Sequence, residues 1–169
     1  MELMDLYDES KNLTGQTIIR ESGKKPNIPD GRFINIVLIF IQNSKKEFLF
    51  QLTSKEKGSV IATTGGHVKS GQTCYDAILA EVNEELGINI KNENIKHIDC
   101  SIFKKVFIDT YYLKKDLDIN SLTLQAEEVA AVKWLSIDEI NELINQNEIR
   151  KNNIEPFKKT INYLNSNKN

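Results

Sequence analysis

The stretch GGHVKSGQTCYDAILAEVNEELGI, residues 65–88, carries the strongest pattern in this chain of 169 residues. Thr73 suits a helix N-cap, Asp76 three residues later fits a capping box, and Gly87 fits the position after the last turn. These signals predict a helix over residues 73–86. Five of the eight glycines lie in this stretch or shortly before it. They indicate a backbone with unusual conformations or close contacts next to the helix.

Three glutamates, Glu81, Glu84 and Glu85, fall within about 100° of one another on the predicted helix. Like charges at this spacing repel, and the negative C-terminal pole of the helix dipole adds to the repulsion. A cation would balance the cluster, and hard oxygen ligands suit Mg²⁺ or Mn²⁺. Such an ion binds phosphate oxygens and activates a water molecule. The alternative interpretation is a solvated acidic face without a ligand.

The whole stretch resembles the Nudix box, G-x5-E-x7-R-E-U-x-E-E-x-G-U, in which U is a bulky aliphatic residue. Two of the fixed places differ, because Gln72 replaces the first glutamate and Ala80 replaces the arginine. The lead-in and the N-terminal part look most like the subgroup similar to isopentenyl-diphosphate isomerase. The other seven of the nine fixed places match without a gap: Gly66, Glu81, Val82, Glu84, Glu85, Gly87 and Ile88.

The two departures bear on catalysis. In the Nudix family the first glutamate and the arginine form an ion pair that supports the loop and orients the catalytic carboxylates. Here both partners are neutral, so no buried charge is left stranded and the fold need not suffer. The resemblance therefore implies an intact fold whose activity is weakened by Gln72 and Ala80.

The same resemblance assigns roles to the glutamates. Glu81 and Glu85 would be the principal metal ligands, and the backbone carbonyl of Gly65 would complete the shell. Glu84 would hold a further ion or a metal-bound water and would act with Glu85 in catalysis. Family members often take one more glutamate from the segment ahead of a late tryptophan. In this chain Glu128 is the first choice, as metal ligand or general base, and Glu127 is the second; a surface turn residue is the alternative.

Three more residues are candidates for substrate binding. His67 and Lys69 follow the two glycines and would contact a phosphate or the leaving group. Asp109 alternates with apolar residues on a predicted strand and would face the cleft. Each has a plain alternative, as a loop residue or a solvent-facing strand residue. Many relatives have an arginine where this chain has Leu52-Thr53, so a phosphate contact would be absent or would come from Arg20, Lys55 or Lys57.

Strand signals surround the helix. Residues 33–42, FINIVLIFIQ, are rich in Ile, Val and Phe, which is typical of a buried strand. The order of strands, one helix, strands and then helices indicates an α+β fold with a mixed sheet. The resemblance implies an α/β/α sandwich and one domain over residues 1–169, with an N-terminal hairpin and connection over 1–31. Further strands are expected over residues 3–7, 16–20, 47–52, 59–64, 95–102, 105–113 and 129–135, and further helices from Ser136 and over 153–164.

Composition narrows the classes of protein. The net charge of −2 argues against generic affinity for a nucleic acid polymer or an anionic membrane. No apolar run approaches the length that crosses a bilayer, and the N-terminus lacks the features of a signal peptide. Two cysteines without a pairing motif favour reduced thiols in the cytoplasm. We expect a cytoplasmic protein with a small-molecule diphosphate substrate, and a homodimer and a monomer both remain open.

Three functions follow. The first is a metal-dependent hydrolase that cleaves the diphosphate bond of a nucleoside diphosphate linked to another moiety, or of a similar small organic diphosphate. The second is a non-catalytic ligand-binding module, which the neutral Gln72 and Ala80 favour. The third, isopentenyl-diphosphate isomerase, needs a cysteine acid and several histidine ligands, whereas this chain has only His67 and His97. The hydrolase is the expected function.

Overall fold

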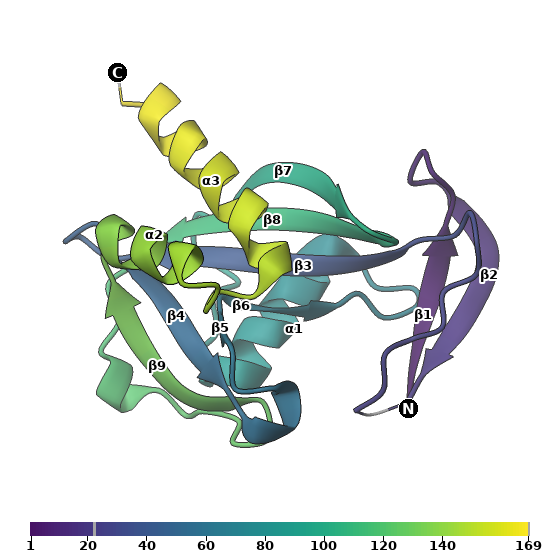
Figure 1. Cartoon of the computed structure of the whole chain (residues 1–169), viewed down its shortest axis with the longest axis horizontal. Coiled ribbons are helices and arrows are strands. Elements are labelled where there is room, and N and C mark those ends of the chain that lie inside the picture. Colours follow the sequence, from purple (N-terminus) through teal and green to yellow (C-terminus); the bar gives the residue numbers. More distant parts are fainter. Residues whose placement is uncertain (22, 169) are drawn as a thin grey trace.

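A mixed β-sheet forms the centre of the computed structural model, which describes residues 1–21 and 23–168 (Figure 1). Strand β3 pairs with β8 in parallel, and its pairs with β4 and β6 are antiparallel. This confirms the α+β fold with a mixed sheet. The strands of this sheet are β3 (Ile34–Gln42), β4 (Phe48–Thr53), β5 (Ile61–Ala62), β6 (Thr64–His67), β7 (Lys96–Phe103), β8 (Val106–Lys114) and β9 (Val129–Leu135).

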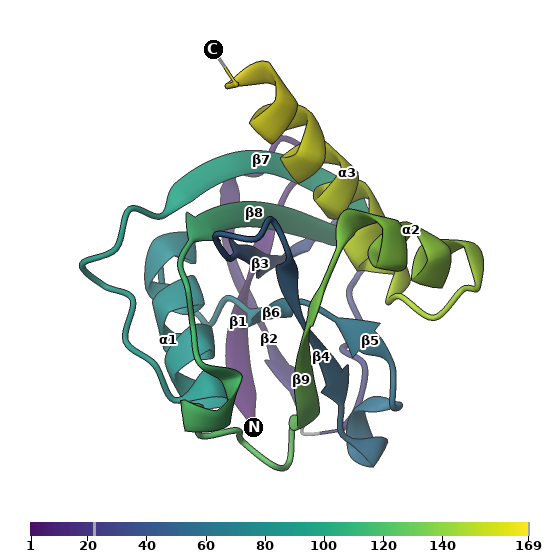
Figure 2. The same ribbon diagram turned by 90° about the vertical axis from the view of Figure 1, so that its left-hand side faces the viewer.

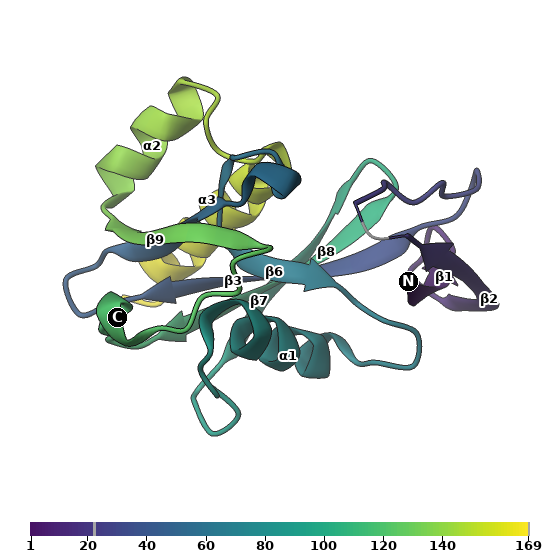
Figure 3. The ribbon, with the colours of Figure 1, turned by 90° about the horizontal axis from the view of Figure 1, so that it is seen from below.

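Helices cover both faces of the sheet (Figure 3). Helix α1 (Cys74–Leu86) packs on one face, and α2 (Ile137–Asn145) and α3 (Lys151–Ser166) lie on the other. Figure 2 shows the same three layers from the side. Because both faces are covered, all nine residues of β3 are buried, which explains its continuous apolar sequence. The expected α/β/α sandwich is therefore confirmed.

The sheet divides beside β3. Strands β3 and β4 pair only where they leave their common turn, at Gln42 and Phe48. From Ile36 to Ile39 the edge of β3 pairs instead with β6, while β4 pairs with β5 and β9. The diverging strands β4 and β6 thus both carry residues that reach α1, and this divergence positions the candidate site.

The segment expected as one strand over residues 59–64 forms two. The break falls at Thr63, whose N–H donates to Asn153 Oδ1 over 2.8 Å and whose hydroxyl bonds the Ile39 carbonyl. Strand β6 then continues through the glycines to His67. The interpretation of His67 as a loop residue was therefore wrong, because β3 supplies backbone partners as far as that position.

An antiparallel hairpin precedes the sheet, as expected. It comprises β1 (Glu2–Tyr7) and β2 (Leu13–Arg20) and lies at one end of the molecule (Figure 1). Its inner side chains, Met4 and Leu6, pack against Ile34. Tyr7 and Phe33 exchange backbone hydrogen bonds of 2.8 and 2.9 Å. In the part of the chain that the structure describes, no helix is long and apolar enough to cross a membrane.

Candidate active site

The ends of α1 are fixed by local sequence. The Thr73 hydroxyl accepts a hydrogen bond from the Asp76 N–H over 3.1 Å. At the other end Gly87 adopts a φ of +70° and donates its N–H to the Asn83 carbonyl over 3.0 Å. A residue with a Cβ is strained in that conformation. The expected helix is confirmed, and its caps set the orientation of the last turns, which carry the three glutamates.

Of the three glutamates of α1, Glu85 is buried, Glu81 is partly buried and Glu84 lies at the exposed rim. Glu85 is only 5% exposed, and Glu81 lies against the backbone of Gly66. The Glu84 side chain is 49% exposed, with Oε1 4.0 Å from Lys69 Nζ. The shared face predicted from helical spacing is thus real for Glu81 and Glu85, while Glu84 turns toward solvent.

Two glycines of β6 allow this close packing. A Cβ on Gly65 would lie 2.1 Å from the Val37 carbonyl oxygen, and one on Gly66 would lie 2.2 Å from Glu81 Oε1. Real Cβ atoms do not approach so closely. The glycines therefore let β6 pair with β3 on one side and touch the glutamate pair on the other.

Glu85 is held by a residue that the sequence did not reveal. Gln51 on β4 donates from Nε2 to Glu85 Oε2 over 3.0 Å. Gln51 is itself buried, and its Oε1 lies 3.3 Å from the Thr64 hydroxyl. Gln51 and Glu85 are 34 positions apart, so no local pattern links them.

Burial makes the glutamate pair costly to ionise. It raises the pKa of Glu81 to about 8, with the charges of Glu85 and Glu84 adding to the shift. It also raises the pKa of Glu85 to about 7, against the hydrogen bonds from Gln51 and the Gly65 backbone. Two neighbouring carboxyl groups whose charged forms are disfavoured make an environment that a bound cation would relieve.

Glu81 and Glu85 have part of the ligand set that a divalent ion needs. Among residues 1–21 and 23–168, no group of three or more His, Cys, Asp or Glu side chains is gathered closely enough to hold a metal as it stands. The carboxylate oxygens of Glu81 and Glu85 nevertheless suit a hard cation in type and charge. Glu84 would join them only from another rotamer, since its carboxylate now lies toward Lys69. The pair fits such an ion, and the third ligand is not preformed.

Two basic residues, Arg20 and Lys57, line a hollow of about 180 Å³ together with Met1, Glu2 and Glu128. Arg20 donates to Glu2 over 2.8 Å, and Lys57 Nζ lies 2.7 Å from Glu128 Oε1. The structure therefore places two of the three candidate phosphate contacts beside Glu128, between the hairpin and the core.

His67 and Lys69 lie near the charged residues of this hollow. Burial, together with the Arg20 charge, lowers the pKa of His67 to about 4, so its imidazole is neutral at pH 7. Lys69 Nζ is 3.7 Å from Glu2 Oε1 and 4.0 Å from Glu84 Oε1. Lys69 thus links the hairpin to the rim glutamate.

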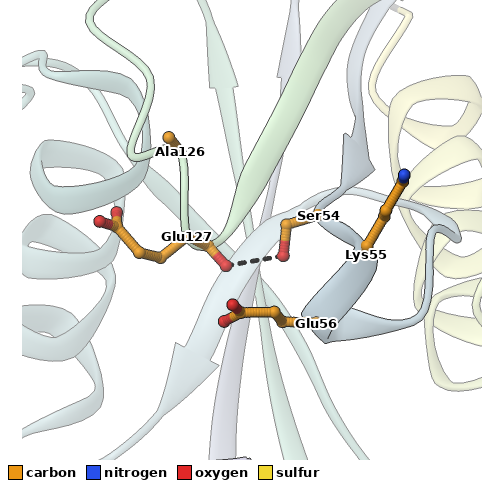
Figure 4. Close-up of a pocket in the computed structure, with 5 residues that line it drawn as sticks. All are labelled: Ser54, Lys55, Glu56, Ala126 and Glu127. Carbon is orange, nitrogen blue, oxygen red and sulfur yellow. Dashed lines mark hydrogen bonds between the residues drawn. The ribbon is translucent and has the colours of Figure 1, made fainter.

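The neighbours Glu127 and Glu128 occupy different surroundings. A second hollow, of about 310 Å³, is lined by Ser54, Lys55, Glu56, Ala126 and Glu127 (Figure 4). The Ser54 hydroxyl donates to the Glu127 carbonyl over 2.7 Å, and the Glu127 side chain points away from that bond. Neither hollow is lined by the α1 glutamates, but the charges of Glu2 and Glu128 in the smaller one act on Glu81 and Glu85. We therefore place the site at Glu81 and Glu85, beside the smaller hollow.

Asp109 belongs to another cluster. It is buried on β8, where Lys11, Asn35 and His97 bond its carboxylate, the last two over 2.9 and 2.8 Å. Cys74 Sγ lies 3.3 Å away. Among the described residues its side chain has no hydrogen bond or ion pair with the α1 glutamates. The structure thus gathers the other candidates and leaves Asp109 apart, engaged with the tip of the hairpin.

Comparison with known proteins gives the family. A model of the NUDIX domain matches residues 32–157. This chain belongs to the Nudix family. It is 33% identical over 153 residues to an uncharacterised Nudix hydrolase of Listeria monocytogenes, covering 88% of each chain. The Nudix match begins just after the hairpin and its connection.

Solved structures share the Nudix fold. The crystal structure of DR0079 from Deinococcus radiodurans aligns with a TM-score of 0.74 and 22% identity, over 89% of this chain and 93% of that one. The Nudix domain of NrtR from Shewanella oneidensis, solved with ADP-ribose, aligns with a TM-score of 0.63 and 10% identity, over 78% and 88%. These likenesses support the fold, and neither names the isopentenyl-diphosphate isomerase subgroup.

Proposed function

We propose that this Nudix protein is a hydrolase that uses Mg²⁺ or Mn²⁺ to cleave a diphosphate bond. The substrate would be a nucleoside diphosphate linked to another moiety, or a similar small organic diphosphate. The observation that carries the proposal is the buried Glu85 next to the partly buried Glu81, which lies against Gly66. A helix selected only for stability would not withdraw two neighbouring carboxyl groups from solvent. The Nudix hydrolase relative in Listeria supports the same reaction class.

The roles of the glutamates follow from their positions. Glu81 and Glu85 would hold the ion, Glu84 would join them after turning from Lys69, and the Gly65 carbonyl would complete the shell. When bound, the ion would supply charge neutralisation at the phosphates and a more acidic water. Gln51 would keep the Glu85 carboxylate in place through its hydrogen bond of 3.0 Å.

Other residues would handle substrate and proton. Glu128 is proposed as the general base for the attacking water, and Lys57 holds its carboxylate in place through their contact of 2.7 Å. Arg20, Lys57 and Lys69 would offer positive charge to phosphate oxygens. The neutral imidazole of His67 would donate or accept one hydrogen bond at the phosphate or leaving group. We propose no substrate contact for Asp109, because its carboxylate is already satisfied by three donors.

The test is a panel of ADP-ribose, diadenosine polyphosphates and nucleoside diphosphate sugars, with Mg²⁺ or Mn²⁺, read out by product chromatography. We expect hydrolysis of at least one compound and a loss of about a hundredfold or more in kcat for Glu85→Gln. Glu155→Gln, an exposed glutamate of α3, serves as the matched control. A metal-dependent activity that survives Glu85→Gln would contradict the proposed site.

Two variants, at Glu128 and at its neighbour Glu127, test the proposed general base. Glu128→Gln should lower kcat by roughly a hundredfold, within the range expected for losing a general base. Glu127→Gln should leave kcat near the wild-type value, because Glu127 lines the other hollow. Equal losses in the two variants would mean that the loop, rather than the Glu128 carboxylate, matters.

One observation favours a second function, that of a non-catalytic binding module. The three α1 glutamates are not gathered around one point, since Glu84 lies toward Lys69. Isothermal titration with ADP-ribose and Mg²⁺ separates the two proposals. Tight binding without turnover, across the panel and both metals, would favour the module. An isomerised allylic product from isopentenyl diphosphate would instead support the isomerase function.

A further inference from the structure

The loop between β6 and α1, residues 68–73, is attached to the N-terminal hairpin. In Figure 1 the chain leaves β6, runs out to β1 and then returns to α1. The Ser70 N–H donates to the Leu3 carbonyl over 2.7 Å. Asp5 accepts twice, from the Ser70 hydroxyl over 2.7 Å and from the Gly71 N–H over 2.9 Å. One carboxylate therefore holds two consecutive residues of the loop.

The loop has little support of its own. The Gln72 side chain accepts from the Lys69 N–H over 3.1 Å, and the Gln72 N–H donates to the Lys69 carbonyl over 3.0 Å. Both bonds close a turn within the loop. An amide at position 72 and a methyl group at position 80 cannot form an ion pair between the loop and α1. The loop is held at its ends by Val68, whose N–H donates to the Asn35 carbonyl on β3, and by Thr73, which caps α1. Between these ends its fixed points lie on the hairpin.

The hairpin is itself anchored, so it can act as a support. At its tip Lys11 binds Asp109 on β8, and its Nζ lies 3.2 Å from Cys100 Sγ on β7. Along β1, Met4 and Leu6 pack against Ile34 of β3. Tyr7 and Phe33 join it to the chain before β3. The hairpin contacts the core on both sides of Asp5.

We propose that Asp5 is a positioning residue for the candidate active site. Its bonds to Ser70 and Gly71 fix the loop that joins Gly66 and His67 to the glutamate helix, and they do the work that a charge pair at positions 72 and 80 would otherwise do. This inference rests on the proposed function for its catalytic consequence. The structural part, that Asp5 orders the loop, stands independently.

Hydrogen exchange measures the structural part directly. In Asp5→Ala the Gly71 amide loses its acceptor and should exchange at least about tenfold faster, the effect expected for losing a hydrogen bond to a charged group. The Ser70 amide donates to the Leu3 carbonyl and should speed up by a smaller factor as the loop loosens. Asp8→Ala is the matched control. Asp8 lies in the same hairpin, but its carboxylate accepts from Ser10 and Asn12 in the turn and, among the described residues, has no bond to the loop. Unchanged exchange in Asp5→Ala, or an equal rise in Asp8→Ala, would overturn the proposal.

Rescue distinguishes positioning from general stability. On the substrate found in the panel, Asp5→Ala should lower kcat roughly tenfold, in line with the same hydrogen bond. Adding Gln72→Glu and Ala80→Arg to Asp5→Ala should recover most of that loss by supplying another support. A triple variant no better than Asp5→Ala, or a kcat unaffected by Asp5→Ala, would refute the catalytic part. If Asp5→Ala does not fold, Ser70→Ala removes one of the same bonds and should show a smaller change of the same kind.

A failure of the proposed function would look different. If the wild-type protein hydrolyses nothing, Mn²⁺ affinity replaces kcat as the readout. Asp5→Ala should then weaken Mn²⁺ binding and speed Ser70 and Gly71 exchange, while Asp8→Ala should do neither. Mn²⁺ affinity and exchange that are both unchanged would reject Asp5 as a positioning residue, whatever the reaction.

Discussion

Gln51 Nε2 on β4 lies 3.0 Å from Glu85 Oε2 on α1, and this hydrogen bond joins the diverging half of the sheet to the glutamate helix. With the Gly65 backbone and the charge of Arg150, it favours the ionised form of a carboxyl group whose burial disfavours it. Gln51 thus acts as a neutral support, in a site where the box arginine is replaced by Ala80.

Replacing Gln51 by leucine should therefore weaken metal binding. The variant keeps much of the buried volume, removes the donor to Glu85 and raises the pKa of that carboxyl further. We expect Mn²⁺ affinity at pH 7 to fall by roughly tenfold, the effect of one hydrogen bond to a charged group. Isothermal titration is the measurement. An unchanged affinity in a folded Gln51→Leu protein would show that Glu85 does not depend on this bond.

Alanine substitutions at the two adjacent glycines of β6 should have different effects, one on stability and the other on metal binding. In Gly65→Ala the new Cβ meets the Val37 carbonyl at 2.1 Å, and backbone cannot easily move. Its free energy of unfolding should drop by about 1–3 kcal/mol or more, as in other overpacked sites. In Gly66→Ala the new Cβ meets the Glu81 carboxylate at 2.2 Å, and this flexible end can turn away.

Gly66→Ala should therefore keep most of its stability and lose metal affinity. Urea unfolding and Mn²⁺ titration of the two variants separate the effects. If Gly66→Ala bound Mn²⁺ as well as the wild type, Glu81 in its present position would not be a ligand.

Local residues made much of this fold predictable. Thr73 and Gly87 determine the ends of α1 through bonds within a few positions, and 129–135 matches β9 because the strand is marked by its own side chains. The break at Thr63 was not predictable, since Asn153 causes it from 90 positions away. The same limit applies to the site. Helical spacing brought Glu81 and Glu85 together, but only the tertiary fold brings Gln51 to them.

The raised pKa values of Glu81 and Glu85 predict an unusual pH dependence for the stability of the metal-free protein. Folding raises the pKa of Glu81 to about 8 and of Glu85 to about 7, from 4.5. Between pH 4.5 and pH 8 the folded state therefore holds protons that the unfolded state has released. The free energy of unfolding must then fall as pH rises through this window.

Urea unfolding in EDTA at pH 5 and pH 8 measures this slope. The double variant Glu81→Gln/Glu85→Gln has no ionisable group at either position, so its free energy of unfolding should lose most of its dependence on pH. At pH 8 the double variant should be more stable than the wild type. Mg²⁺ should stabilise the wild type more at pH 8 than at pH 5, because it binds the ionised carboxylates. Glu155→Gln should behave as the wild type. Wild-type stability that rises from pH 5 to pH 8 without metal would contradict the burial argument.

The last prediction concerns the anchor of the hairpin, Lys11 on Asp109. Burial alone would raise the pKa of Asp109, but hydrogen bonds from Lys11, Asn35 and His97 outweigh it and hold the pKa below its ordinary value. This carboxylate therefore contributes stability above the ordinary pKa, and the contribution is lost as pH falls through the lowered one. Lys11→Ala leaves a side chain only 6% exposed without its ammonium partner.

We expect Lys11→Ala to lower the free energy of unfolding at pH 7 by about 1–3 kcal/mol, less than for a fully isolated buried charge because Asn35 and His97 remain. Its acid unfolding midpoint should also move to higher pH. Lys24→Ala, which breaks an exposed pair with Glu21, should cost under about 1 kcal/mol. Faster amide exchange in β1 and β2 for Lys11→Ala alone would tie the loss to the hairpin. Equal losses in Lys11→Ala and Lys24→Ala would show instead that the Lys11–Asp109 pair does not anchor it.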